Sequence, residues 1–206
     1  MKFSRILDLH KLRSSAFLFG PRMTGKTFLL KGLRTALYCD LLDPERELEL
    51  ERDPKRFWEE ISALSKGSLV IVDEVQRVPV LLDYVQKGIE ELGLRFILSG
   101  SSARKLKRGG ANLLGGRVLD LKLHPLTAEE IGKSFRMELA LQYGTLPKIT
   151  QLVLERDTQE ARRFLHSYYT TYIKEEIQAE ALTRNIGAFQ RFLNVAVQSN
   201  AEVIEF

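Results

Sequence analysis

The sequence contains one cysteine, Cys39, so an intramolecular disulfide is excluded and nothing indicates an oxidising compartment. No stretch without charged residues reaches the roughly 18 residues that a membrane-spanning helix needs. Residues 1–15 lack the apolar segment of a secretory signal. The three histidines lie far apart, without metal-ligand spacing, so a zinc site is not expected. We therefore expect a cytoplasmic protein that does not contact a membrane.

An excess of charge of either sign is also lacking. The 206 residues include 31 Lys and Arg against 27 Asp and Glu, which gives a formal charge of +4. This mild basicity permits a nucleic-acid partner but does not require one. With 44% hydrophobic and 28% charged residues, the composition excludes disordered and fibrous proteins. The length predicts one domain, or one domain and part of another.

Five short apolar runs in the first part of the chain predict β-strands, with amphipathic stretches between them. Near-continuous apolar runs are typical of strands that are buried on both faces of a sheet. The runs are residues 16–19, 37–42, 68–72, 95–98 and 118–123, the last with a looser, alternating character. The pattern therefore predicts an α/β fold, in which helices cover a parallel sheet.

Helical signals lie between these runs and dominate the second half of the chain. The predicted helices follow residues 53–54, run along residues 79–93, begin at the capping box of residues 127–130, and cover residues 158–181 and 189–197. Because no strand is expected after residue 135, we predict an α/β domain over residues 1–135 and a helical region over residues 136–206.

Residues 20–27, GPRMTGKT, match the phosphate-binding pattern G-x-x-x-x-G-K-[ST] between a predicted strand and a predicted helix. The glycines let the backbone curl so that its N–H groups converge on phosphate oxygens. Lys26 would contact the β- and γ-phosphates, and the Thr27 hydroxyl would bind Mg²⁺. The candidate nucleotide-binding residues are Gly20, Pro21, Arg22, Met23, Thr24, Gly25, Lys26, Thr27 and Phe28. The alternative is a simple glycine turn, which would leave Lys26 at the electrostatically unfavourable end of a helix.

Two carboxylates follow the apolar run LVIV of residues 69–72. Asp73, at the end of this predicted strand, is a candidate Mg²⁺ ligand on the side opposite Thr27. Glu74 is a candidate catalytic base that polarises a water molecule for attack on the γ-phosphate. The pair favours hydrolysis of a nucleotide. The alternative, two solvated acids at a strand end, is less favoured because the phosphate-binding pattern precedes them.

Ser99 and Ser101 follow the predicted strand of residues 95–98. A hydroxyl at this position is suited to sensing the γ-phosphate or orienting the attacking water, and Ser99 is the catalytic candidate. The alternative is a turn of small residues that caps the next helix. Because the guanine-reading sequence N-K-x-D is absent, adenine is the expected base, and ATP or ADP the expected nucleotide.

Six segments follow one another in a distinctive order and spacing. They are residues 19–27 (FGPRMTGKT), 41–44 (LLDP), 72–79 (VDEVQRVP), 97–106 (ILSGSSARKL), 116–117 (GR) and 123–126 (LHPL). Together they resemble the prokaryotic AAA-type ATPases of the AAA+ superfamily that carry a C-terminal domain of unknown function.

The resemblance implies a P-loop core of three αβα layers, in which five parallel strands have the order 5-1-4-3-2. It also implies ATP and Mg²⁺ as ligands, with Asp73 and Glu74 in the roles given above. Residues 136–206 would be the start of the C-terminal domain, truncated here. Members of the family commonly have Arg-Asp where this chain has Glu175 and Glu176.

Two basic features have competing interpretations. Arg117, just before the fifth predicted strand, is a candidate for stabilising charge on the γ-phosphate, within the chain or from a neighbouring subunit. The alternative is an arginine that only aids solubility. The basic cluster of residues 104–108 is able to follow a nucleic-acid backbone, but it lacks interleaved aromatic residues, so a solvated face is favoured.

The favoured function is an ATPase that hydrolyses ATP to ADP and phosphate with Mg²⁺ and couples this to a conformational change in the helical region. One alternative is a nucleotide-gated module with little turnover that binds DNA or a protein. A weaker one is a P-loop kinase that acts on a small molecule and uses residues 104–108 as its lid. A DNA or protein partner and oligomerisation are left open.

Overall fold

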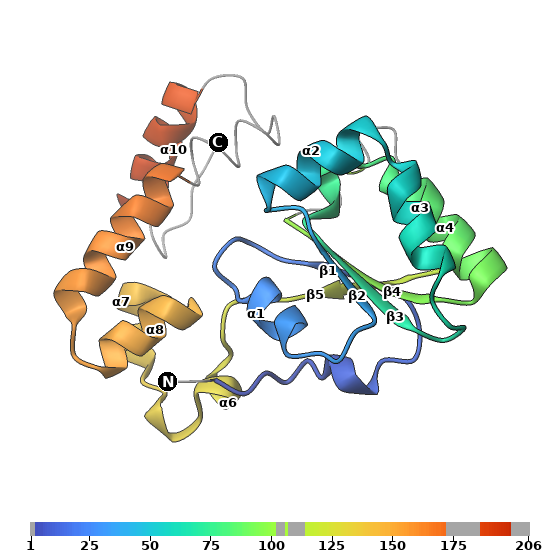
Figure 1. Cartoon of the computed structure of the whole chain (residues 1–206). Helices are drawn as coiled ribbons and strands as arrows, with labels where there is room; N and C mark the ends of the chain where they lie inside the picture. The colour runs from blue at the N-terminus through green and yellow to red at the C-terminus, as the bar shows by residue number, and fades with distance from the viewer. Residues whose placement is uncertain (1–2, 102–105, 107–113, 172–185, 199–206) are drawn as a thin grey trace.

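The computed structural model describes residues 3–101, 106, 114–171 and 186–198. Its centre is a parallel sheet of five strands in the order β2-β3-β4-β1-β5 (Figure 1). The strands are β1 (Ala16–Phe19), β2 (Leu37–Asp40), β3 (Leu69–Asp73), β4 (Arg95–Gly100) and β5 (Leu119–Lys122). The predicted order 5-1-4-3-2 is therefore confirmed, and a strand overlaps each of the five apolar runs, with β3 and β4 extending one and two residues beyond theirs.

Helices cover both faces of the sheet, which gives the predicted three layers. The covering helices are α1 (Lys26–Lys31), α2 (Pro44–Arg52), α3 (Lys55–Ser62) and α4 (Leu81–Leu92). Figure 1 shows α2, α3 and α4 on one side of the sheet and α1 on the other. Successive residues of a strand face opposite sides, so Val70 and Val72 pack in the core under α2–α4 while Ile71 packs with Leu30 of α1.

Helix α2 is the element of the core that the apolar pattern misses. Its sequence, PERELELER, has one buried residue, Leu50, so no apolar stripe marks it. The end signals are nevertheless present, because Asp43 caps the helix by accepting a hydrogen bond from the N–H of Glu45, and Pro44 occupies the first turn. These two residues also end β2 at Asp40, two residues before the end of the predicted run.

A second group of helices follows β5. They are α6 (Ala128–Ile131), α7 (Met137–Tyr143), α8 (Pro147–Leu154), α9 (Thr158–Thr171) and α10 (Ile186–Gln198). A short 3₁₀ turn, Gly132–Ser134, follows α6, and two others lie earlier in the chain, at Leu9–Lys11 before β1 and at Val75–Arg77 after β3. The predicted capping box of Thr127 and Glu130 begins α6. Helices α7, α8 and α9 have their own apolar cluster, which includes Tyr143, Ile149 and Ala161.

The helical character of this second region agrees with the sequence, since the described residues beyond Lys122 contain no strand. Helices α7 and α8 are short and were not individually predicted. The exact division at residues 135 and 136 stays a prediction. Within the described residues, no helix combines the length and the apolar character needed to span a membrane.

Candidate functional site

The loop of residues 20–25 connects β1 to α1 at the carboxyl edge of the sheet, and Lys26 and Thr27 are the first two residues of α1. Gly20 is required by a close approach, because a Cβ at this position would lie 2.3 Å from the carbonyl oxygen of Leu123. Gly25 has a φ of +93°, a left-handed conformation that glycine adopts readily. Met23 also has a positive φ, of 64°. The sequence therefore folds into a tight loop that is fixed against the end of β5.

The Lys26 side chain is buried against this loop, with 6% of its surface exposed. Its Nζ donates hydrogen bonds to the carbonyl oxygens of Gly20, at 2.7 Å, and Pro21, at 3.2 Å. The positive charge is thus held where the loop curls. A buried ammonium group requires such acceptors or an anion, so the loop is chemically suited to a negatively charged ligand.

Asp73 ends β3 and is completely buried. Its Oδ2 accepts a hydrogen bond of 2.9 Å from the Tyr38 hydroxyl, and its Oδ1 accepts one from the Ser99 hydroxyl. Burial, followed by the charge of Asp73, raises the pKa of Tyr38, so this phenol remains a donor throughout the physiological range. Two hydroxyl donors therefore orient the carboxyl group of Asp73.

Asp73 lies on the face of the sheet that α1 covers. Ile71, two residues earlier and hence on the same face of β3, packs in one cluster with Leu30 of α1. Thr27 is one turn before Leu30 on that helix. The fold thus brings the predicted metal ligands, Thr27 and Asp73, to the same corner of the structure.

Glu74 has a left-handed backbone, with a φ of 61° and a ψ of 46°. Its N–H donates to the Ser99 hydroxyl oxygen at 3.0 Å, and its carboxylate accepts a hydrogen bond from the Gln76 side-chain amide. Ser99 thus joins the two acids, because it donates to Asp73 and accepts from Glu74. The sharp turn at residue 74 directs this carboxylate away from the strand and into an adjoining cleft.

This cleft has a volume of about 710 Å³, within the range of ligand-binding sites. It is lined by Arg22, Met23, Gly25, Lys26, Thr27, Phe28, Leu42, Glu74, Gln76, Arg77 and Ser101. The Oε1 of Gln76 and the Oγ of Ser101 are buried and have no hydrogen-bond partner among the residues that the structure describes. Because a carboxylate only accepts, the Gln76 amide nitrogen must face Glu74, which leaves Oε1 to be satisfied by another group. Polar and charged side chains therefore line this cleft, which suits it to a polar ligand.

A second cavity, of about 420 Å³, lies on the other side of the loop. Its walls come from the N-terminal arm, the loop, α1 and α8, and are mostly apolar: Phe3, Arg5, Thr24, Gly25, Phe28, Leu29, Leu126, Pro147, Lys148 and Gln151. Phe28 lines both cavities, which therefore adjoin at the start of α1. Sequence reasoning missed this second cavity because residues from opposite ends of the chain form it.

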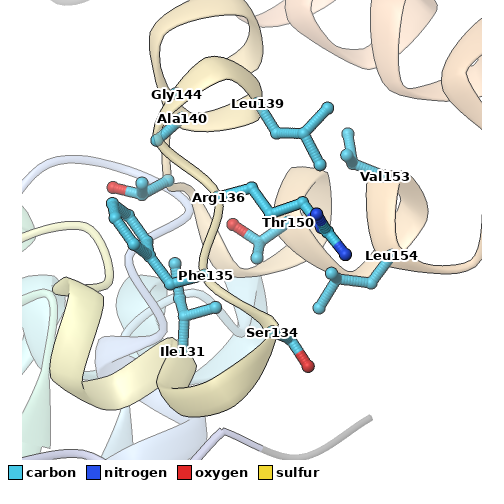
Figure 2. A pocket seen from close by; sticks show the side chains of 11 residues that line it. Ile131, Ser134, Phe135, Arg136, Leu139, Ala140, Gly144, Thr150, Val153 and Leu154 are labelled. Atoms are coloured by element: carbon cyan, nitrogen blue, oxygen red, sulfur yellow. The ribbon is translucent and has the colours of Figure 1, made fainter.

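A third, much smaller pocket lies among the helices that follow β5 (Figure 2). Its volume of about 20 Å³ is enough for one water molecule. Thr150 lines this pocket, and its buried hydroxyl has no partner among the described residues. A single bound water would satisfy this hydroxyl, so the pocket is a feature of packing rather than a competing functional site.

Ser99 and Arg117 were expected near the γ-phosphate, but neither lines the cleft. Ser99 is completely buried behind the two acids, whereas Ser101 lines the cleft. Arg117 precedes β5 and pairs with Glu90 of α4. Since β5 is parallel to β1, Arg117 lies at the amino edge of the sheet, about 16 Å of extended strand from the loop.

That distance corrects the expectation of a role for Arg117 within its own chain, because an arginine side chain is too short to span it. A contact from a neighbouring subunit stays a prediction. The basic cluster of residues 104–108 and the pair Glu175 and Glu176 fall largely or wholly outside the described residues.

A sequence family described as AAA domain matches residues 13–132. Uncharacterized proteins of Mycobacterium bovis and Mycobacterium tuberculosis are each 29% identical to this chain over 164 residues. The match covers 78% of this chain and 35% of each relative, so the chain spans about a third of the length of these curated relatives.

Solved structures with a similar course of the chain include the replication initiator DnaA bound to AMPPCP and single-stranded DNA. The TM-score is 0.49 at 15% identity, covering 97% of this chain and 68% of that one. The Aeropyrum pernix ORC1 protein in complex with DNA has a TM-score of 0.42 at 12% identity. The match covers 93% of this chain and 74% of that one. Likenesses at this level say nothing about what this chain binds.

Proposed function

Because this chain belongs to the AAA domain family of P-loop ATPases, we propose that it binds ATP with Mg²⁺ and hydrolyses it to ADP and phosphate. The observation that carries the proposal is the cleft that Lys26, Thr27 and Glu74 line together, with Asp73 buried behind it. Lys26 and the loop N–H groups would bind the β- and γ-phosphates. The side chains of Arg22, Gln76 and Ser101, which also line the cleft, support a polar occupant.

The residues present fit a Mg²⁺ ion that enters with the nucleotide. Mg²⁺ prefers oxygen ligands and is usually bound by one or two protein groups together with phosphates and water. Thr27 and Asp73 offer a hydroxyl and a carboxylate, each from an ordered element of the fold. When bound, the ion would neutralise charge on the β- and γ-phosphates.

Glu74 is the group proposed to act on water. Its carboxylate would accept a proton as the water oxygen bonds to the γ-phosphorus and the bond from that phosphorus to the bridging oxygen of ADP breaks. The left-handed backbone at residue 74 and the hydrogen bond from Gln76 hold this carboxylate at the cleft. Ser99 would act indirectly, by positioning Asp73 and the N–H of Glu74.

The second cavity is the proposed site of the adenine base. It adjoins the phosphate loop at Gly25 and Phe28 and has apolar walls suited to a flat, uncharged ring. Pro147 of α8 belongs to the helical region and forms part of this wall, so the base would contact both parts of the chain. This contact supports coupling between the nucleotide and the helical region.

Met23 supports the same coupling from the phosphate loop. Its side chain packs against the apolar cluster of the helical region, which includes Ile149 and Ala161. A shift of the loop on binding or hydrolysis would therefore displace a residue that packs against this cluster. Whether the helical region acts on DNA, on a protein or on another subunit stays open in this proposal.

Replacing Tyr38 with phenylalanine is expected to weaken the use of Mg²⁺. The change removes the 2.9 Å hydrogen bond to Asp73 and so frees the carboxylate to reorient. Loss of such an outer partner typically costs about 10–100-fold in metal affinity. The Mg²⁺ concentration for half-maximal ATP turnover should rise accordingly, while Tyr84→Phe, on α4 beside Trp58, should leave it unchanged. An unaltered Mg²⁺ dependence would refute this role for Tyr38.

The proposal is tested by incubating the purified chain with ATP and MgCl₂. We expect free phosphate and ADP in equal amounts, a loss of both with EDTA, and a preference for ATP over GTP. Tight ATP binding without phosphate release would favour the nucleotide-gated module instead. Transfer of phosphate to an added acceptor would favour the kinase.

A further inference from the structure

Arg5 of the N-terminal arm contacts three segments that are far from it in the sequence. Its Nη1 donates to the Thr24 carbonyl oxygen at 2.8 Å, its Nη2 to the His124 carbonyl oxygen at 2.6 Å, and its Nε to Glu130 at 2.9 Å. Its side chain is 10% exposed and that of Glu130 is 4% exposed. Figure 1 shows the arm running beside α6. One guanidinium group thus joins the arm, the phosphate loop, the end of the sheet and α6.

The contact with Thr24 fixes the back of the phosphate loop. Thr24 is completely buried, and its hydroxyl donates to the Pro21 carbonyl oxygen at 2.8 Å. A loop that binds phosphate needs its N–H groups directed at the anion and its carbonyl groups directed elsewhere. Arg5 provides a buried donor for the Thr24 carbonyl and so favours that orientation.

The contact with Glu130 fixes α6, the first helix after the sheet. The same carboxylate accepts hydrogen bonds from the N–H groups of Ile6, at 2.9 Å, and Thr127, at 3.1 Å. Burial would raise the pKa of Glu130, but the hydrogen bonds from Ile6, Thr127 and Arg5 outweigh it and lower the pKa. Glu130 therefore remains ionised at neutral pH, and it links Arg5 directly to the capping box of α6.

We propose that Arg5 is a positioning residue that couples the phosphate loop through Glu130 to α6, the helix that precedes the helical region. Binding of ATP would then order α6 and the helices after it, and their order would in turn strengthen binding, because such coupling is reciprocal. The role requires arginine. Its planar fork reaches three acceptors in different directions, whereas a lysine ammonium is a point charge. This inference rests on the proposed binding of ATP, but not on its hydrolysis.

The test compares Arg5→Lys, Glu130→Gln and the double variant with the natural chain. Affinity is measured with a fluorescent ATP analogue, and hydrogen exchange is followed at α6 and α7 with and without ATP. Each single change should weaken binding on the order of tenfold. The double variant should be no weaker than the worse single one, because both changes break the same link. ATP should slow exchange in α6 in the natural chain and do so far less in the variants.

Arg163→Lys is the matched control, because Arg163 also pairs with a glutamate, Glu160, but on an exposed surface. It should change neither affinity nor exchange. Lower melting temperatures with unchanged affinity, or additive effects in the double variant, would overturn the proposal. If Arg5→Lys does not fold, the affinity and hydrogen exchange of Glu130→Gln alone test the proposal. Glutamine keeps the shape of the glutamate side chain and one acceptor oxygen. If the natural chain itself does not bind ATP, the proposed function fails instead.

Discussion

Replacing Lys26 with alanine should abolish ATP binding at the concentrations that saturate the natural chain. The ammonium is buried in the loop and would exchange the carbonyl oxygens of Gly20 and Pro21 for phosphate oxygens. Removing one partner of a buried, hydrogen-bonded charge pair costs about 2–5 kcal/mol, which corresponds to at least about thirtyfold in affinity. The variant also leaves two carbonyl groups without their donor and beside the ligand, which adds repulsion.

Titration with a fluorescent ATP analogue measures this effect, with thermal melting to verify the fold. Lys55→Ala is the control. Lys55 is an exposed lysine at the start of α3, which covers the face of the sheet opposite α1. A Lys26→Ala protein that melts normally and binds ATP with natural affinity would contradict the phosphate-binding role of the loop.

Replacing Glu74 with glutamine should leave ATP bound but stop its turnover. The amide has nearly the same shape and keeps an acceptor for the hydrogen bond from Gln76, but it does not accept a proton from water. General-base catalysis contributes about 10²–10⁴-fold, so phosphate release should fall by that factor while the Kd for ATP changes little. Single-turnover assays and retention of labelled ATP on a filter separate the two quantities.

Glu90→Gln is a suitable control, since Glu90 is an exposed acid on α4 that pairs with Arg117 at the opposite edge of the sheet. Natural turnover in Glu74→Gln would remove the assignment of the base. A loss of binding as large as that of Lys26→Ala would instead mean that Glu74 maintains the shape of the cleft.

The sheet could be predicted because local signals and tertiary structure agree there. The central strands β1, β3 and β4 are buried on both faces, so their apolar residues stand together in the sequence, as in the burial of Val70, Ile71 and Val72. The phosphate loop and the acidic pair could be predicted for a similar reason. Each is a continuous segment at a strand end, where the chemistry of the site dictates the residue types.

The residues that support the site could not be predicted, because their partners are distant in the chain. Arg5 and Glu130 are 125 positions apart, and Tyr38 and Asp73 are 35 apart. Nothing in the local sequence distinguishes Arg5 from a solvated arginine. The position of Arg117, by contrast, could be predicted. In a parallel sheet, the residues that precede the strands lie at one edge and the loops that follow the strands lie at the opposite edge.

The left-handed backbone of Glu74 implies that this protein gives up stability at the residue proposed to activate water. A residue with a side chain in that conformation costs on the order of 1 kcal/mol, and glycine would adopt the same φ of 61° without that strain. Glu74→Gly should therefore melt at a temperature no lower than the natural chain does, in spite of losing a carboxylate at the cleft. It should also hydrolyse ATP no faster than Glu74→Gln. Such a pair of results would mean that selection has kept the glutamate for its chemistry, against the conformational preference of the turn.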